Sequence, residues 1–73
     1  MAQVTVTAGG TSVIRNYNNI GDVRADNVTE TYLGLSYRDS RLSLNNETAD
    51  ANDSTSLRDG DVIRVEPKSH TKG

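Results

Sequence analysis

Hydrophobic and polar residues alternate in short segments along the chain, and each alternating segment predicts a half-buried strand. The first is Val4-Thr5-Val6-Thr7-Ala8, and a less regular return segment runs from Ser12 to Tyr17. Gly9-Gly10 lies between them, and two consecutive glycines supply the positive φ angles that a tight hairpin turn needs. The N-terminal part of the chain therefore predicts a β-hairpin.

A helix is predicted from Asn19 to Gly34. Asn19 suits the N-cap, Asp22 lies near the positive end of the helix, and Gly34 suits the C-terminal cap. The residues expected on one buried face are Ile20, Val23, Val28, Tyr32 and Leu33. The interior is poor in strong helix formers, so this helix depends on tertiary packing. Asp26-Asn27 can break it in two, and a strand from Val28 to Leu33 is the alternative.

The second half of the chain predicts further strands. Arg41-Leu42-Ser43-Leu44 alternates, Asn45-Asn46 forms a tight turn, and Glu47-Thr48-Ala49 can return as a short strand. A polar loop then leads to Leu57, which we expect in the core. The turn at Arg58-Asp59-Gly60-Asp61 opens the last strand, Val62 to Glu66. These elements predict an α+β domain over residues 1–66, followed by a polar tail over residues 67–73.

Composition limits the chemistry that this chain can support. With 73 residues it is near the lower size limit of an unstapled domain, and with 33% hydrophobic residues and no Phe or Trp its core must be aliphatic. The absence of cysteine excludes disulfides and thiolate zinc sites, and the single His70 leaves no histidine cluster. We therefore expect neither a metal nor a cofactor. No segment reads as a membrane span or a signal peptide, which predicts a cytoplasmic protein.

The charge distribution bears on the partner. Residues 1–66 contain six arginines against ten acidic residues, hence −4, and the only lysines are Lys68 and Lys72 in the tail. An acidic body argues against a duplex DNA binder. Nucleophilic catalysis lacks both a cysteine and a histidine in the body to activate a serine. The turn explains Asp59 and Asp61 without acid–base chemistry, so we expect a protein that is not an enzyme.

The order of elements resembles the β-grasp, or ubiquitin-like, superfamily. The residues that carry the resemblance are Asn19-Ile20-Gly21-Asp22-Val23 at the helix start and Leu57 to Ile63 at the last strand. The chain is most similar to the small prokaryotic sulfur carriers, in which an Asn-Gly-Glu turn follows the third strand, and Asn45-Asn46-Glu47 stands at that place here. The resemblance implies a mixed sheet of four to five strands with one helix packed on one face.

The chain departs from those relatives at its end. Sulfur carriers and ubiquitin-type modifiers end in Gly-Gly, because two residues without side chains fit the narrow channel of the activating enzyme. Here the end is Thr71-Lys72-Gly73, and the Lys72 side chain would clash in such a channel. Carrier or modifier chemistry through Gly73 is therefore an alternative to simple binding.

We expect instead that the chain binds another protein. Three surfaces are candidates: an exposed sheet face around Arg15, Leu42 and Arg64, an unpaired sheet edge, or the tail with Lys68 and Lys72. Tyr37 with Arg38 and Arg41 could add an exposed contact patch of the kind that interfaces favour. A small structural subunit of a viral or mobile-element assembly is a further alternative. The partner and the oligomeric state stay open.

Overall fold

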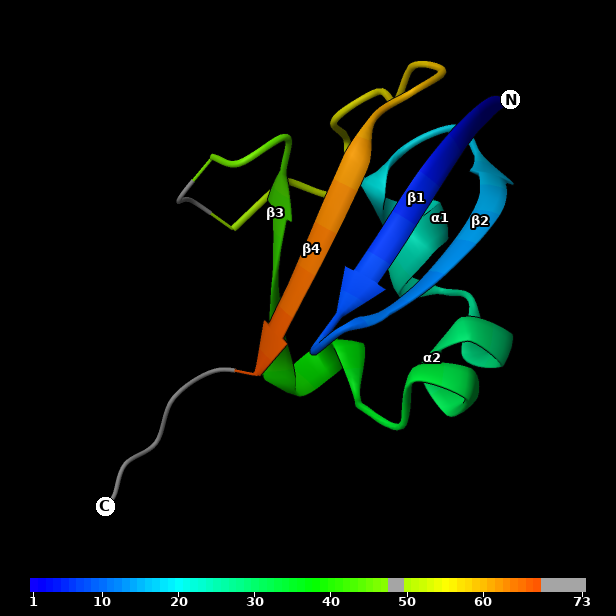
Figure 1. Ribbon diagram of the computed structural model, residues 1–73. Coiled ribbons are helices and arrows are strands. Elements are labelled where there is room, and N and C mark those ends of the chain that lie inside the picture. Colours follow the sequence, from blue (N-terminus) through cyan, green and yellow to red (C-terminus); the bar gives the residue numbers. More distant parts are fainter. Residues whose placement is uncertain (48–49, 68–73) are drawn as a thin grey trace.

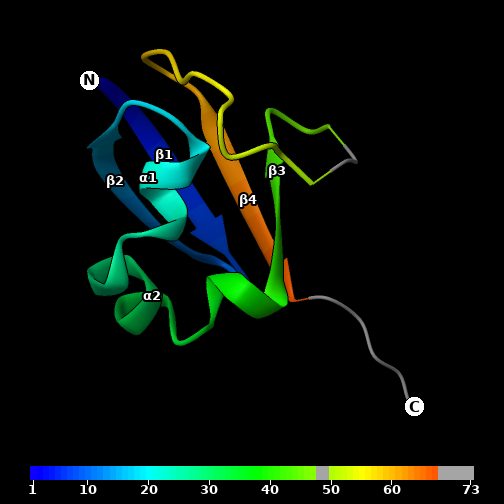
Figure 2. The same cartoon turned by 180° about the vertical axis from the view of Figure 1, so that it is seen from behind.

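The computed structural model describes residues 1–47 and 50–67. A four-stranded sheet carries short helices on one of its faces, so the predicted α+β class is confirmed (Figures 1 and 2). The strands are β1 (Ala2–Ala8), β2 (Thr11–Tyr17), β3 (Ser40–Leu44) and β4 (Val62–Pro67). The helical segments are α1 (Ile20–Arg24), α2 (Asn27–Leu33) and a 3-10 turn (Tyr37–Asp39).

The strands lie in the order β2-β1-β4-β3. β1 pairs antiparallel with β2 and parallel with β4, and β3 pairs antiparallel with β4. The first and last strands therefore occupy the middle of the sheet, whereas β2 and β3 form its edges (Figure 1). A fifth strand is not present in the described part of the chain. Glu47 lies outside any strand, and the remainder of the short strand expected there, residues 48 and 49, lies outside the described residues.

The N-terminal hairpin forms as predicted. Gly9 and Gly10 have φ angles of 55° and 90°, both positive, as a two-residue turn matched to the twist of the strands requires. The register runs without a bulge from the Ala8–Thr11 pair to the Ala2–Tyr17 pair. Because the side chains of a strand alternate between faces, this register determines which residues of β2 face the helices.

The helical region is divided in two. The Asn19 side chain accepts a hydrogen bond from the Asp22 amide (2.9 Å) and caps α1, and α1 ends after Arg24. Asp26 then caps α2 through the amides of Val28 and Thr29. Gly34 ends α2 with φ 73°, as expected. The expectation of a break at Asp26-Asn27 is confirmed, and the alternative strand over 28–33 is wrong, because this second cap starts a new helix.

The core lies between the helices and one face of the sheet. Its buried hydrophobic members are Ala2, Val4, Val6, Tyr17, Ile20, Val23, Tyr37, Leu42, Leu57, Ile63 and Val65. Leu57 therefore re-enters the core as predicted. Val28 and Tyr32 do not belong to it, since they are 62% and 64% exposed. The prediction that they lie in the core is wrong, because the face of α2 that packs on the sheet carries Thr29, which is 1% exposed.

The polar loop before β4 is attached to the sheet at several points. The Gln3 amide donates to Asp59 Oδ1 (2.8 Å), and the Gly60 amide donates to the Gln3 carbonyl (2.9 Å). The Arg58 amide donates to Asp61 Oδ2 (2.8 Å), which fixes the turn that opens β4. Of the helices in the described ranges, none has the length and apolar character needed to cross a membrane.

Candidate interaction surface

The three positions expected on one exposed sheet face lie in three different environments. Arg64 of β4 pairs with Thr7 and points to the open face, away from the helices. Arg15 of β2 pairs with the buried Val4, so its side chain lies on the helix face. Leu42 pairs with the buried Val65 and is 0% exposed. The expectation that Leu42 lies on an exposed face is wrong, because strand alternation turns it toward the core.

The expected exposed patch of Tyr37 with Arg38 and Arg41 does not form either. Tyr37 is 1% exposed, and its amide donates to Glu30 Oε2 (2.8 Å). Arg38 and Arg41 are exposed. Arg41 lies 3.2 Å from the Glu66 carboxylate in an ion pair that solvent screens on both sides. The aromatic half of the predicted patch is therefore inside the protein.

The remaining predicted contact residues belong to the tail. Lys68 and Lys72, together with the alternative carrier terminus Gly73, lie outside the described residues. Their roles in binding or in carrier chemistry stay predictions.

The outer edge of β3 is occupied by the chain itself. The Leu42 amide donates to Asp50 Oδ1 (3.0 Å), and the Leu42 carbonyl accepts from the Ala51 amide (2.7 Å). The ends of β3 are closed by hydrogen bonds from the Ser40 amide to the Tyr37 carbonyl and from the Glu47 amide to the Leu44 carbonyl. An incoming strand would have to displace these bonds, so this edge is not open for pairing.

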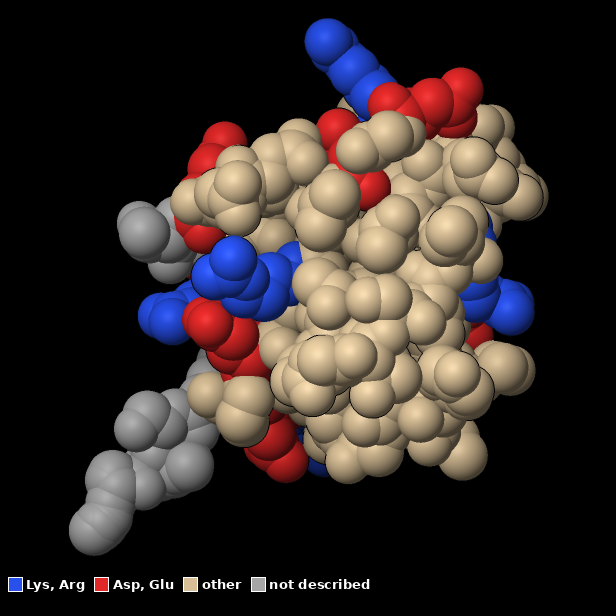
Figure 3. All heavy atoms as spheres, viewed as in Figure 1, with Lys and Arg blue, Asp and Glu red and all other residues tan. Residues whose placement is uncertain are grey.

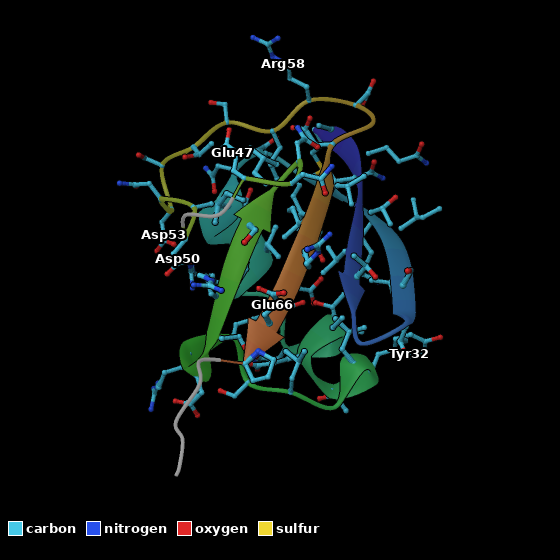
Figure 4. All side chains as sticks on the ribbon, turned by 60° about the vertical axis from the view of Figure 1, so that its left-hand side comes forward. Tyr32, Glu47, Asp50, Asp53, Arg58 and Glu66 are labelled. Carbon is cyan, nitrogen blue, oxygen red and sulfur yellow. The ribbon has the colours of Figure 1, made fainter. Side chains whose placement is uncertain are left out.

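Arg24 of α1 holds the loop that covers β3. Its Nη2 lies 2.7 Å from Asp50 Oδ1 and also donates to the Ala51 carbonyl (3.1 Å). Its Nε lies 2.6 Å from Asp53 Oδ1 as an ion pair without hydrogen-bond geometry. Figure 4 shows Asp50 and Asp53 close together beside the outer edge of β3. The cover on β3 is thus anchored to the helix layer.

The outer edge of β2 has no comparable cover. Because the hairpin turn has two residues, Ala8 and Thr11 form a hydrogen-bonded pair, and the odd-numbered residues of β2 bond to β1. The even-numbered residues Ser12, Ile14 and Asn16 therefore direct their N–H and C=O groups away from the sheet. Within residues 1–47 and 50–67, no backbone or side-chain group bonds to these outward groups.

The direction of the backbone hydrogen bonds of β1 supports this assignment. Thr5 pairs with Ile14, and the Thr5 amide donates toward β4, to the Asp61 carbonyl (3.0 Å). In an antiparallel pair the residues of a non-hydrogen-bonded position both point their backbone groups outward. Thr5 uses its groups on the β4 side, and Ile14 leaves its own groups free on the other side.

The open face of the sheet is uncharged over β1 and β2, whereas β4 places Arg64 and Glu66 on it, with Arg41 of β3 beside Glu66. Figure 3 shows charged side chains on the β3 side of this face and a broad surface of other residues next to them. By register, β1 and β2 contribute Gln3, Thr5, Thr7, Ser12, Ile14 and Asn16 to it. Two apolar side chains are exposed here, Ile14 at 64% on the edge strand and Val62 at 42% on the central strand β4.

α2 contacts the same edge strand, β2, and lies on the β2 side of the molecule in both ribbon views (Figures 1 and 2). Its outer surface carries a shallow hollow lined by Asn27, Val28, Thr31 and Tyr32. Tyr32 projects on the β2 side of the molecule in Figure 4. The described chain has five exposed large hydrophobic side chains, and three of them, Ile14, Val28 and Tyr32, come from β2 and α2.

Asp26 connects α2 to β2. Its Oδ2 accepts a hydrogen bond from the Tyr17 hydroxyl (2.7 Å) and lies 3.1 Å from Arg15 Nε. Burial alone would raise the pKa of Asp26, but the hydrogen bonds from Tyr17 and from the amides of Thr29 and Val28, together with Arg15, bring that pKa below its ordinary value. The carboxylate therefore stays charged and neutralises the one cation of β2.

The two inward tyrosines continue this network. Burial, and then the hydrogen bond to the Asp26 carboxylate, raise the pKa of Tyr17 to about 12. Burial also raises the pKa of Tyr37, whose hydroxyl shares a 2.7 Å hydrogen bond with Thr29 Oγ1. The Tyr17–Asp26 bond joins β2 to the start of α2. Tyr37 and Thr29 are each only 1% exposed, so their hydrogen bond lies inside the protein.

A polar pocket lies between α2 and the 3-10 turn. It is lined by Arg24, Asn27, Glu30, Ser36, Tyr37 and Arg38. Of its two cations, Arg24 is paired with Asp50 and Asp53, and the charge of Arg38 is balanced by Glu30 of the same lining, so the pocket lacks the excess positive charge of an anion site. Among the described residues there is no group of three or more Asp, Glu, His or Cys side chains that could hold a metal ion.

The exposed edge residue that the sequence patterns did not single out is Ile14. The signal was available in the hairpin: a two-residue turn at Gly9-Gly10 pairs Ile14 with the polar Thr5 and so places it on the outward face.

Comparison with protein-family models, curated proteins and solved structures finds no match to this chain.

Proposed function

We propose that this chain is a non-enzymatic, ubiquitin-like β-grasp protein that binds another protein by accepting a strand along the open edge of β2. The sheet order β2-β1-β4-β3, with its parallel central pair and with the helices on one face, is compatible with a β-grasp fold. The observation that carries the proposal is the row of outward backbone groups at Ser12, Ile14 and Asn16. Such a row is a template for strand addition.

β2 also lacks most of the devices by which proteins usually protect an edge. These devices are proline, lysine, a bulge, a very short strand or an inward-pointing charge. β2 has seven residues, contains neither Pro nor Lys, and keeps an unbroken register with β1. Its only charge, on Arg15, lies on the helix face and is bonded to Asp26. An approaching strand therefore meets no uncompensated charge at this edge.

Proline at position 14 tests the edge without disturbing the hairpin ladder. The Ile14 amide points outward and makes no bond to β1, so Ile14→Pro removes a donor only from the free edge. Its counterpart for the tail is a copy truncated after Pro67. We would use intact protein, Ile14→Pro and the truncated copy as baits in extracts of the source cells, with bound proteins identified by mass spectrometry.

The proposal expects a partner that binds the intact and the truncated forms and is lost with Ile14→Pro. A partner that binds Ile14→Pro as well as the intact protein would refute contact at the β2 edge. A terminal thiocarboxylate on the intact protein, together with partners that vanish on truncation, would support the carrier alternative through Gly73. Circular dichroism of each bait confirms that it is folded.

A further inference from the structure

We infer that the strand added to β2 is β2 of a second copy of this chain, so that two copies form a symmetric dimer with one continuous sheet. This inference rests on the proposed edge function and names its partner. Its basis is that β2 is complementary to itself in one antiparallel register.

The register follows from the outward groups. Placing Ile14 opposite Ile14 of the second copy brings Ser12 opposite Asn16 of that copy, and Asn16 opposite its Ser12. All three outward residues then form hydrogen-bonded pairs, each of which exchanges two N–H···O bonds. A shift of the dyad to Arg15 would place Ser12 opposite Asn18, outside β2, and a shift to Val13 would place Asn16 opposite Gly10, in the hairpin turn.

The side chains agree with this register on both faces. On the open face the exposed Ile14 packs on its own symmetry mate, and the amide of Asn16 meets the hydroxyl of Ser12. On the helix face Val13 lies opposite Arg15 of the second copy. Each Arg15 keeps Asp26 of its own chain at 3.1 Å, so the pairing leaves no uncompensated like charges at the dyad.

The helix layer adds apolar surface next to this edge. A two-fold axis perpendicular to the sheet places both α2 helices on the same face of the joined sheet. α2 contacts β2, as α1 does, and it exposes Val28 and Tyr32. A single strand pair buries less than a standard interface, so the dimer belongs to the weaker, concentration-dependent class.

The closed edge at β3 limits the assembly to two copies. If both edges were open, copies could join edge to edge without end and form fibres. Leu42 is bonded to Asp50 and Ala51 on that side, so only β2 can take part. An interface in which both copies use the same strand has two-fold symmetry, so each copy has one binding edge and the assembly stops at a dimer.

The first test of the dimer is sedimentation velocity over a concentration series from about 10 μM to about 1 mM, a range that covers the dissociation constants expected for a weak dimer. We expect reversible conversion of monomer to dimer and no larger species. Ile14→Pro removes two N–H···O bonds per dimer and should weaken dimerisation by about thirtyfold. Val62→Lys is the matched control, because it changes the other exposed apolar side chain of the open face on a central strand. It should dimerise like the unmodified chain.

Amide hydrogen exchange of the unmodified chain tests the register without any substitution. The amides of Ser12, Ile14 and Asn16 should exchange quickly in the monomer and become protected as the concentration rises. The amides of Val13 and Arg15, which bond to β1, should be protected at every concentration. Protection that rises equally at odd and even positions of β2 would contradict edge pairing.

Single cysteines locate the dyad, since the chain has no cysteine of its own. In Ile14→Cys the two Cα atoms would lie about 5.5 Å apart across the dyad, whereas in Ser12→Cys they would lie about 14 Å apart. A short bifunctional reagent that alkylates two thiols, such as a bis-maleimide, should therefore link Ile14→Cys dimers efficiently and Ser12→Cys dimers poorly.

The outcomes separate this inference from the proposed function. A chain that stays monomeric throughout the series, or a dimer that Val62→Lys abolishes and Ile14→Pro does not, overturns self-pairing at β2. In that case a cellular partner that is lost with Ile14→Pro would still support strand addition by a different protein. Loss of neither the dimer nor the partner on Ile14→Pro overturns both.

Discussion

Replacement of Asp26 by Asn probes the contact between α2 and the edge strand. The substitution keeps an oxygen that can cap the amides of Val28 and Thr29, so the start of α2 is retained. It removes the negative charge that accepts the Tyr17 hydroxyl at 2.7 Å and faces Arg15 Nε at 3.1 Å. The change therefore isolates the charged link between helix and sheet from the cap.

The expected loss of stability follows from these contacts. A hydrogen bond to a charged group contributes about 1.5–3 kcal/mol. The Asp26 side chain is only 12% exposed, which limits solvent screening, whereas Arg15 is 46% exposed and its ion pair adds at most about 1 kcal/mol. We therefore expect Asp26→Asn to lower the free energy of unfolding by about 2 kcal/mol. In a domain of this size that is a large share of a total of about 4–10 kcal/mol.

The pH dependence gives the prediction a second readout. The folded-state pKa of Asp26 lies below the ordinary value of 3.8, so its contribution is complete above that value and is lost as the pH falls through the folded-state pKa. Urea unfolding followed by circular dichroism, from neutral pH down to about pH 2, should show the gap between the two proteins closing in acid.

Asp39→Asn is the matched control. It removes the same charge from an exposed side chain that makes no bond or ion pair in the described structure, so it should change stability by less than about 0.5 kcal/mol. The reasoning fails if Asp26→Asn is as mild as this control, or if its difference from the unmodified protein is the same in acid as at neutral pH.

Three further predictions concern the rest of the fold. Gly34→Ala should cost about 1 kcal/mol in urea unfolding, because φ is 73° there while the space around it is open. Leu42→Ala should cost about 3 kcal/mol in the same assay, since this side chain is fully buried. Tyr17, whose pKa is raised to about 12, should ionise in an ultraviolet titration only well above pH 10. Because that pKa is raised, its contribution is complete below pH 10 and is lost as the pH rises toward 12, so the phenolate signal should coincide with unfolding.

The strands, turns and caps could be predicted from the sequence because their signals are local. Gly9-Gly10, the Asn19 cap and the two Asn residues at positive φ each act within a few residues of themselves. Leu42 is an instructive error. The alternation Arg41-Leu42-Ser43-Leu44 already assigns Leu42 to the same inward face as Leu44, so its assignment to a contact surface ignored the strand period.

The orientation of α2 was beyond local signals. Val28 and Tyr32 form one pair at helical spacing, and Thr29 and Leu33 form another, rotated by one residue. Either pair could face the sheet. The hydroxyl of Thr29 bonds to the hydroxyl of Tyr37 eight residues on, and the Asp26 cap is held by Tyr17. These tertiary hydrogen bonds select the rotation of α2 about its axis that buries Thr29 and exposes Tyr32.

The open edge depends on information that no local pattern contains. β2 becomes an edge only because β4, more than forty residues later, pairs with the other side of β1. β3 would be an equal edge, but the carboxylate of Asp50, eight residues after Leu42, occupies its amide. The two edges therefore differ because of one loop and its anchor on Arg24. An acidic side chain in a polar loop is ordinary in the sequence, yet here it covers the β3 edge and leaves β2 as the uncovered edge of the described sheet.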